Sequence, residues 1–529
     1  KTLSDKKLSC DAYAYGRRPG PGSPWTQGTR RSKSHSTQKC GESIAEHFSS
    51  GPRCLCRPPR RVQARAALVY FSSPRDGTPL RRWGGRMDVS SAEDYMEGFS
   101  STHAEARSKF RAAALRAGAV VKKLAYDDET ASAPFPRERL FVDVALWGCA
   151  VGEARCLLVH SSGVHGVEGF SGSAIQVDAL RRLADSPPRA NGLAVALIHG
   201  VNAHGMREGR RWTAAGVDLN RNFLVGATSH ASLRDESDDS LYRLVAPFVN
   251  PEAPTEAFPN TEFYAAVAYN VLRYGYGALK QAIAGGQRAA ASAGHADRGR
   301  GGPWSWRCKH FRGQLSRRCF RAQPVVSPPS HRYTFPGGLF FGGHALEPAY
   351  CVVVEELRSW RCAALEKACH IDVHTGLGPR GHDTLISATG ADNVVTEMLA
   401  CGSATAGKKV EGWDAGETSY RTTGDFVGNA LDVILAGAPP QTAPRRAALV
   451  QEFGTEPALQ VLAALRAEAT LMRSCAARGE APPPQSHPLR RRVRDAFYPE
   501  HDDFWKRDVL KRGAALFDAA LRWLDEAPS

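Results

Sequence analysis

The residues best suited to chemistry in this sequence are His165 and Glu168, three positions apart in a glycine-rich segment. A catalytic zinc ion is typically held by three His, Glu or Asp side chains, two of them close in sequence and one distant, with a further position open for water. The spacing His-x-x-Glu supplies the close pair. The same spacing recurs at His344 and Glu347, so the motif alone does not identify a metal site.

A third candidate ligand, His374, stands at the end of the apolar segment CHIDVH and before the segment TGLGPRG. We expect CHIDVH to be a strand that His374 ends, which would place the imidazole at the edge of a sheet where α/β proteins carry functional groups. Asp372 lies on the same face of that strand and is a candidate acceptor for the far N–H of a ligand imidazole. A buried histidine with a purely structural role is the competing interpretation.

Two further segments offer groups that could act beside a metal. Arg210 and Arg211 precede the segment GVDLNRNF, which contains Asn220 and Arg221. A guanidinium group matches a carboxylate and can stabilise an oxyanion as it forms, although an ordinary charged turn has the same composition. Glu452 ends the apolar segment ALVQEF, where an unpaired carboxylate is costly unless it has a partner or a role. One such role is that of a base acting on a metal-bound water.

The elements that would position these side chains begin at about residue 139. Apolar strands alternate with helices there: LFVDVALWG, RCLLVHSSG and LAVALIHGVN are typical of strands, and SGSAIQVDALRRLA is typical of a helix. We expect a helix near 261–284, strands at 369–374 and 448–454, and a final amphipathic helix at 504–524. This alternation predicts an α/β fold built on a largely buried sheet.

The formal net charge of +15 is concentrated in two segments. Residues 1–86 hold 18 Lys and Arg against 5 Asp and Glu, residues 288–331 hold 9 against 1, and the remainder is mildly acidic. Both segments are rich in Arg, Ser, Pro and Gly without periodicity, which predicts disorder. The first methionine is Met87, so we expect a catalytic domain over 87–529, interrupted by an insertion at 288–331. Residues 1–86 are then either sequence outside the native protein or an organelle transit peptide.

Several other classes of protein are disfavoured by the sequence. No RNA-binding signature accompanies the basic segments, and we expect no nucleic-acid partner. No apolar run of membrane-spanning length occurs, so we expect a soluble, cytoplasmic protein, or an organelle protein if 1–86 is a transit peptide. Thirteen cysteines without a CxxC pair favour thiols in a reducing compartment. The Gly-x-Gly-x-x-Gly pattern from Gly376 is followed by a strand-like segment, not by the helix of a dinucleotide site, and Ser171 and Ser173 lack the G-x-S-x-G context of a nucleophile elbow.

Four blocks, in the order HSSGVHGVEG, GVDLNRNF, DVHTGLGPRGH and QEFGT, resemble the signature blocks of the zinc carboxypeptidase superfamily. More narrowly, they resemble a branch of it filed as a domain of unknown function (number 2817). The resemblance runs from about residue 90 to the C-terminus. It implies a mixed, mostly parallel central sheet flanked by helices. The sequence departs from the branch at RRWTAAG, where polar and acidic residues usually follow the two arginines.

The resemblance also implies roles for individual residues. His165, Glu168 and His374 would bind zinc, and Glu452 would be the general base and acid. The corresponding mechanism has Glu452 take a proton from a zinc-activated water and return it to the leaving amine.

The substrate-binding residues follow from the same resemblance. Asn220 and Arg221 would hold the terminal carboxylate of the substrate, and either Arg210 or Arg211 would support the oxyanion. Tyr420 is a candidate for the mobile phenol of the family.

We therefore expect a metallocarboxypeptidase-like hydrolase acting on a peptide. A deacylase of N-acyl amino acids, of the aspartoacylase and succinylglutamate desuccinylase kind, shares the metal site and stays open as an alternative. A metal-free pseudoenzyme and a nucleic-acid binder that uses the basic segments are the non-enzyme alternatives, and the oligomeric state is left open.

Overall fold

The structure, a computed structural model, covers the chain in several stretches. It describes residues 96–127, 139–186, 192–225, 240–253, 255–280, 283, 338–362, 364–388, 392–412, 422, 424–436 and 443–526. The predicted extension 1–86, the predicted insertion 288–331 and Tyr420 lie outside the described residues. The division of the chain at these boundaries stays a prediction.

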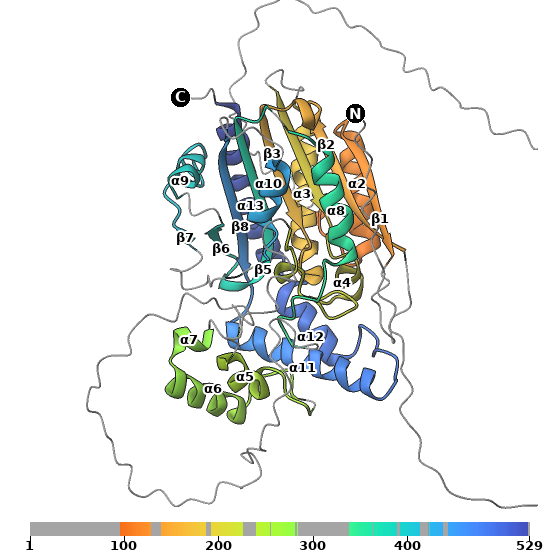
Figure 1. Cartoon of the computed structure of the whole chain (residues 1–529), viewed down its shortest axis with the longest axis vertical. Helices are drawn as coiled ribbons and strands as arrows, with labels where there is room; N and C mark the ends of the chain where they lie inside the picture. The colour runs from red at the N-terminus through yellow and green to blue at the C-terminus, as the bar shows by residue number, and fades with distance from the viewer. Residues whose placement is uncertain are drawn as a thin grey trace, which may run out of the picture. The chain divides into compact units, whose positions relative to one another are not determined.

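The described strands form one eight-stranded sheet in the order β1-β2-β4-β3-β5-β8-β6-β7 (Figure 1). The four central strands, β4, β3, β5 and β8, run parallel to one another, whereas β1, β2 and β6 pair with antiparallel neighbours. The predicted mixed α/β sheet is therefore confirmed. The strand bounds are β1 Val120–Asp127, β2 Arg139–Gly148, β3 Cys156–Ser162, β4 Leu193–His199, β5 Lys367–Arg380, β6 Asp383–Ser387, β7 Val410–Gly412 and β8 Arg445–Gly454.

Helices cover both faces of this sheet, because β3 and β4 are buried along their whole length and need apolar cover on each side. On one face, Tyr350 and Phe426 belong to the cluster formed with α8 and α10. On the other, Phe110 and Phe517 belong to the cluster formed with α2, α3, α9 and α13. The bounds of these helices are α2 His103–Arg116, α3 Gly169–Ala184, α8 Pro348–Ser359, α9 Asp392–Ala400, α10 Val427–Leu435 and α13 Asp503–Asp525.

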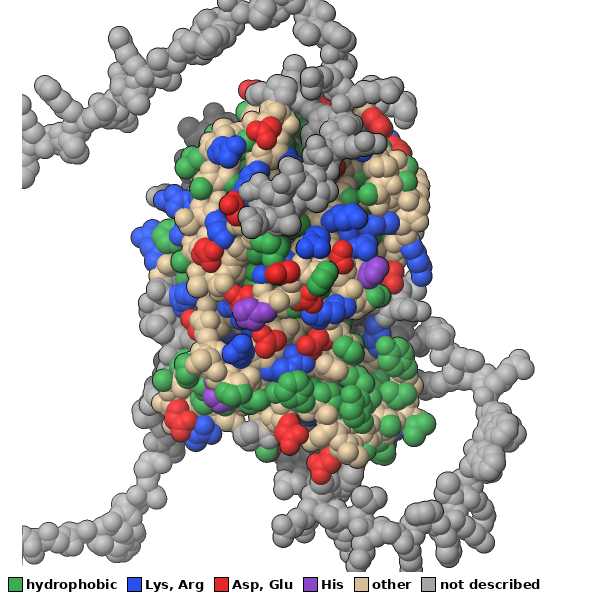
Figure 2. Space-filling view, turned by 180° about the vertical axis from the view of Figure 1, so that it is seen from behind, with side chains coloured by type: hydrophobic (Ala, Val, Ile, Leu, Met, Phe, Trp, Pro, Cys, Tyr) green, Lys and Arg blue, Asp and Glu red, His purple; other side chains and the backbone are tan. Residues whose placement is uncertain are grey.

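A further group of helices lies at the end of the sheet where the central parallel strands finish (Figure 1). Val245, Leu279, Val461 and Val493 belong to one apolar cluster that joins α5, α7, α11 and α12. Figure 2 shows hydrophobic side chains gathered on the surface of the part formed by α5 to α7. The bounds are α4 Ala203–Glu208, α5 Ser240–Val249, α6 Thr261–Tyr274, α7 Tyr276–Lys280, α11 Ala458–Ala477 and α12 Pro488–Phe497, with short 3₁₀ turns η1 Val151–Glu153, η2 Gly166–Glu168 and η3 Leu219–Arg221.

Two sequence-based expectations about elements are wrong. His374 does not end its strand, because β5 continues to Arg380 and its pairing with β8 shifts register after Gly376. The single helix expected near 261–284 is two helices, α6 and α7, separated at Gly275. Gly275 has φ +83°, which a right-handed helix does not accommodate. The first error concerns the length of a strand and the second the continuity of a helix. In both places the type of element, strand or helix, is as expected.

Two of the compositional expectations can be compared with the described residues. No helix among them is long and apolar enough to cross a membrane. Cys149, Cys156, Cys362, Cys369, Cys401 and Cys475 are free thiols in the described part of the chain.

The turn after β3 approaches α4 so closely that only glycine fits at position 166. Gly166 donates its backbone N–H to the carbonyl of Arg211 at 3.2 Å. A Cβ atom on Gly166 would lie 2.1 Å from the carbonyl carbon of Gly205 and 2.2 Å from the backbone nitrogen of Met206. Backbone atoms cannot rotate away, so a side chain here would displace the turn that carries both His165 and Glu168.

We therefore expect Gly166→Ala to lower the free energy of unfolding by about 1–3 kcal/mol, the usual cost of overpacking a buried site. Gly277→Ala is the matched control, because a Cβ at Gly277 meets no atom within 4 Å and Gly277 lies inside α7. That control should be neutral or slightly stabilising. Urea denaturation measures both, and equal stability of the two variants would contradict the close approach.

Candidate metal centre

The structure brings His165, Glu168 and His374 together at one end of the central strands. His165 and Glu168 lie on the turn that follows β3, and His374 lies on the neighbouring strand β5. One ligand atom from each residue lies within 4.8 Å of the others, and all three side chains are buried. Among the described residues this is the one group of three His, Cys, Asp or Glu side chains placed to hold a metal ion.

The atoms that converge are the two Nδ1 atoms and the carboxylate. His374 Nδ1 lies 3.0 Å from His165 Nδ1 and 3.0 Å from Glu168 Oε2, and His165 Nδ1 lies 3.0 Å from Glu168 Oε1. Two imidazoles and one carboxylate form the ligand set of many catalytic zinc sites, which leave a further position for water. The donor set therefore fits zinc.

The far nitrogen of each imidazole faces a buried carboxylate. His165 Nε2 lies 3.0 Å from Asp218 Oδ1, and His374 Nε2 lies 2.8 Å from Asp372 Oδ2. A proton on each Nε2, shared with a carboxylate, would leave the Nδ1 lone pair available to a metal ion held by the cluster. The structure thus places Asp372 where the sequence suggested an acceptor. Asp218 was missed, although it lies in the block GVDLNRNF that drew attention to Asn220 and Arg221.

Asp218 connects three parts of the site. Besides facing His165, it accepts hydrogen bonds from Arg211 Nη2 at 3.1 Å and from the backbone N–H of Asn220 at 3.0 Å. Burial alone would raise the pKa of Asp218, but the charges of Arg211 and His165 hold that pKa well below its ordinary value. Asp218 is therefore an ionised anchor for both a candidate ligand and a cation.

The two adjacent arginines have different positions. Arg211 lines the pocket, donates from Nη1 to Glu168 Oε1 at 3.0 Å, and lies between the rings of Phe340 and Phe497. Arg210 pairs through Nε with Glu468 of α11 at 2.6 Å and is not among the residues that line the pocket. Of the two arginines between which the sequence did not decide, Arg211 is the one that lines the pocket.

Glu452 lies directly beside His374, because the two residues are partners in the parallel register of β5 and β8. Its Oε1 accepts a hydrogen bond from the backbone N–H of Leu377 at 2.9 Å. Burial, together with the negative charge of Glu168, raises the pKa of Glu452 to about 7.

The pKa of Glu168 moves in the opposite direction. Burial would raise it, but the charges and hydrogen bonds of His165 and His374 lower the pKa of Glu168. For His374, burial is outweighed by Asp372 and Glu168, which raise its pKa well above the ordinary value. Two neighbouring carboxylates with pKa values moved apart are suited to different roles, Glu168 as an anionic ligand and Glu452 as a proton acceptor and donor.

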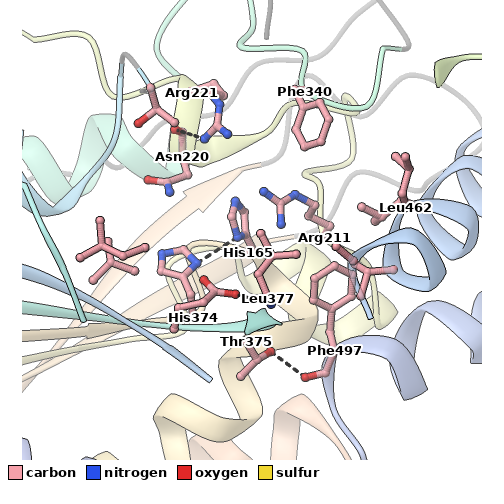
Figure 3. A pocket seen from close by; sticks show the side chains of 17 residues that line it. His165, Arg211, Asn220, Arg221, Phe340, His374, Thr375, Leu377, Leu462 and Phe497 are labelled. Atoms are coloured by element: carbon pink, nitrogen blue, oxygen red, sulfur yellow. Dashed lines mark hydrogen bonds between the residues drawn. The ribbon is translucent and has the colours of Figure 1, made fainter. Parts of the chain in front are cut away.

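The pocket around this cluster has two unlike sides (Figure 3). Asn220 and Arg221 lie on one side, where Arg221 Nη1 donates to the carbonyl of Asn220 at 2.8 Å. The other side is mainly apolar. The residues that line the pocket are His165, Arg211, Asn220, Arg221, Phe340, His374, Thr375, Leu377, Ile386, Thr422, Val450, Glu452, Ala458, Val461, Leu462, Leu465 and Phe497.

Comparison with known families gives one match over most of the chain. The model described as "Protein of unknown function (DUF2817)" matches residues 99–305 and 328–512, which is more than half of the sequence. The predicted branch is therefore confirmed. No curated protein matches.

Several solved structures are similar to the chain. Carboxypeptidase A from Helicoverpa armigera is 10% identical with a TM-score of 0.34, over 78% of this chain and 73% of that one. A metallo-carboxypeptidase from Burkholderia cenocepacia is 11% identical with a TM-score of 0.31, over 72% and 71%. Murein-tripeptide amidase MpaA from Escherichia coli O157 is 14% identical with a TM-score of 0.25, over 65% and 91%.

The first test of the site is its metal content. We expect His165→Ala to lose most of the zinc that the wild-type protein retains after dialysis, because two remaining ligands hold a metal far more weakly than three. His344→Ala is the matched control, since His344 has the same His-x-x-Glu spacing but lies apart from the cluster. Elemental analysis by mass spectrometry measures both proteins, and equal zinc in the His165 variant and the control would refute the ligand assignment.

Proposed function

The chain belongs to the DUF2817 family of proteins of unknown function, and we propose that it is a zinc-dependent hydrolase that cleaves an amide bond next to a carboxylate-bearing residue. The observation that carries the proposal is the pairing of a buried His165, Glu168 and His374 cluster with Glu452 on the adjacent strand. A metal site with a carboxylate of raised pKa beside it has the parts needed to activate water.

When bound, zinc would supply Lewis-acid chemistry, acidifying a water molecule and polarising the carbonyl of the substrate. Glu452 takes the proton of the attacking water, and the same carboxyl group then delivers it to the leaving amine. A carboxylate with a pKa near 7 can do both at neutral pH, since neither its protonated nor its ionised form is strongly disfavoured.

Arg211 is proposed to stabilise the oxyanion that develops on the substrate carbonyl. Its guanidinium is held by two buried carboxylates, those of Glu168 and Asp218, so it is oriented before the substrate arrives. Preorganised cations of this kind contribute most where water is excluded. Arg210, which was an equal candidate in the sequence, has the separate task of neutralising the buried Glu468.

Asn220 and Arg221 are proposed to hold the carboxylate of the substrate. Arg221 is almost fully buried and lies over the ring of Phe340, with its centre 5.8 Å from the ring centroid, so its side chain has little freedom. An amide and a guanidinium at one end of the pocket can together donate hydrogen bonds to a planar carboxylate. This clamp suits a C-terminal peptide residue and the amino acid of an N-acyl amino acid equally.

The role of Glu452 is tested by Glu452→Gln. The variant should retain zinc, because Glu452 is not part of the ligand cluster, and should lose about 10²–10⁴-fold in kcat, the usual contribution of a general base. Zinc content and turnover are measured on the same preparation. A zinc-loaded Glu452→Gln protein with wild-type kcat would refute the assignment.

The pH dependence follows from the same residue. Glu452 must be ionised to accept a proton, so kcat/KM of the wild type should fall as the pH drops below its pKa. That pKa is about 7 without a cation, and a bound cation lowers it, so we expect the acidic limb at or below pH 7. A profile that stays flat from pH 4 to pH 8 would be inconsistent with Glu452 as the base.

The carboxylate clamp is tested by Arg221→Ala with paired substrates. The variant would lose a charge-assisted hydrogen bond to the substrate carboxylate. The free energy of such a bond corresponds to a fall of about tenfold to a hundredfold in kcat/KM for a substrate with a free carboxylate. The same substrate with a terminal carboxamide is the control, and its kcat/KM should change much less. Equal losses for both substrates would show that Arg221 does not recognise the carboxylate.

A further inference from the structure

The side of the pocket opposite Asn220 and Arg221 is built mainly from one helix. Four pocket-lining residues of α11 follow the spacing expected for a single helical face. Phe340 and Phe497 extend this surface towards Arg211. We call the six residues the apolar wall: Ala458, Val461, Leu462, Leu465, Phe340 and Phe497.

Figure 3 shows how the wall lies relative to the candidate metal ligands. Phe340, Leu462 and Phe497 are on the Arg211 side of the pocket, and Asn220 and Arg221 are on the other side of His165. The candidate ligands therefore lie between a polar end and an apolar end.

Charged residues near the wall are engaged elsewhere. Arg466 of α11 donates from Nε to the carbonyl of Phe248 at 2.7 Å, and Glu468 pairs with Arg210. Arg211 lies on this side of the pocket, and its charge is matched by Glu168 and Asp218. All six residues of the wall are uncharged, so the wall itself cannot pair with a charged group of a substrate.

We propose that the apolar wall is a binding subsite for the acyl side of the scissile amide and that it selects an aliphatic or aromatic group there. This inference rests on the proposed function. A substrate whose carboxylate lies at Asn220 and Arg221 places its scissile carbonyl at the metal and its acyl group against α11. Two kinds of substrate carry an apolar group on the acyl side of the amide. One is an N-acyl amino acid with an apolar acyl chain, and the other is a peptide with an apolar residue before the scissile bond.

The wall predicts a dependence on chain length. Burying each additional methylene of an acyl chain should raise kcat/KM by about three- to fourfold until the wall is covered. The assay uses N-acyl phenylalanines from acetyl to decanoyl and, in parallel, N-blocked dipeptides with Ala, Leu, Phe, Lys or Glu before a constant phenylalanine. A rise with chain length supports an acyl-chain subsite, and a preference for Leu or Phe confined to the peptides supports a peptide source. A preference for acetyl, Lys or Glu would overturn the proposal.

A pair of leucines on α11 provides the matched variants. Leu462 lines the pocket, whereas Leu459 is on the same helix, is also partly exposed and does not line it. We expect Leu462→Ala to reduce the ratio of decanoyl to acetyl kcat/KM by about tenfold or more, from the loss of buried apolar contact. Leu459→Ala should keep the wild-type ratio. Equal ratios in the two variants would contradict a contact between the wall and the acyl group.

Binding without turnover separates this inference from the function on which it rests. In the zinc-loaded Glu452→Gln protein, isothermal titration calorimetry with the same N-acyl phenylalanines should show tighter binding for longer chains. If the wild type hydrolyses both series with neither a rise with acyl-chain length nor a preference for Leu or Phe in the peptides, the subsite is wrong and the proposed function stands. If the zinc-loaded wild type hydrolyses no member of either series, the proposed amide hydrolysis fails and the subsite proposal fails with it.

Discussion

A carboxylate removed from water has to be paired, and the way Asp218 meets this requirement organises the whole site. Asp218 is fully buried, and its two oxygens face His165, Arg211 and the backbone N–H of Asn220. Leaving such a charge without partners would cost several kcal/mol, so the three groups are held where Asp218 needs them. One electrostatic requirement thus aligns a candidate metal ligand, the cation proposed for the oxyanion and the start of the carboxylate clamp.

The second candidate histidine ligand is supported from within the sheet. Asp372 faces His374 and also accepts a hydrogen bond from Ser161 Oγ at 2.6 Å, across the register that pairs Ser161 with Asp372. Ser161 in turn lies 2.8 Å from the buried His370. Because these contacts follow from strand register, the orientation of His374 depends on the central sheet and not on a loop. The same sheet sets Glu452 beside His374 on the next strand.

The pocket is formed where this sheet meets the helices at its end. The sheet contributes the groups proposed for water activation, and α11 with Phe340 and Phe497 contributes apolar surface. The two sets of residues meet at Arg211, whose guanidinium lies over the rings of Phe340 and Phe497.

The sequence by itself determined the local parts of the protein. Strand and helix types followed from apolar periodicity. The spacing of His165 and Glu168 made them candidates, but it recurs at His344 and Glu347, so the pair was singled out by the other polar segments and by the resemblance of four ordered blocks. Tertiary structure decided what lies between distant segments: that Arg211 faces the pocket while Arg210 turns to Glu468, that Asp218 supports His165, and that α11 forms one side of the pocket. It also corrected the end of β5 and the helix interrupted at Gly275. The reason is physical, since periodicity reflects neighbours along the chain, whereas contacts between residues far apart in sequence are set by strand register, helix packing and the pairing of buried charges.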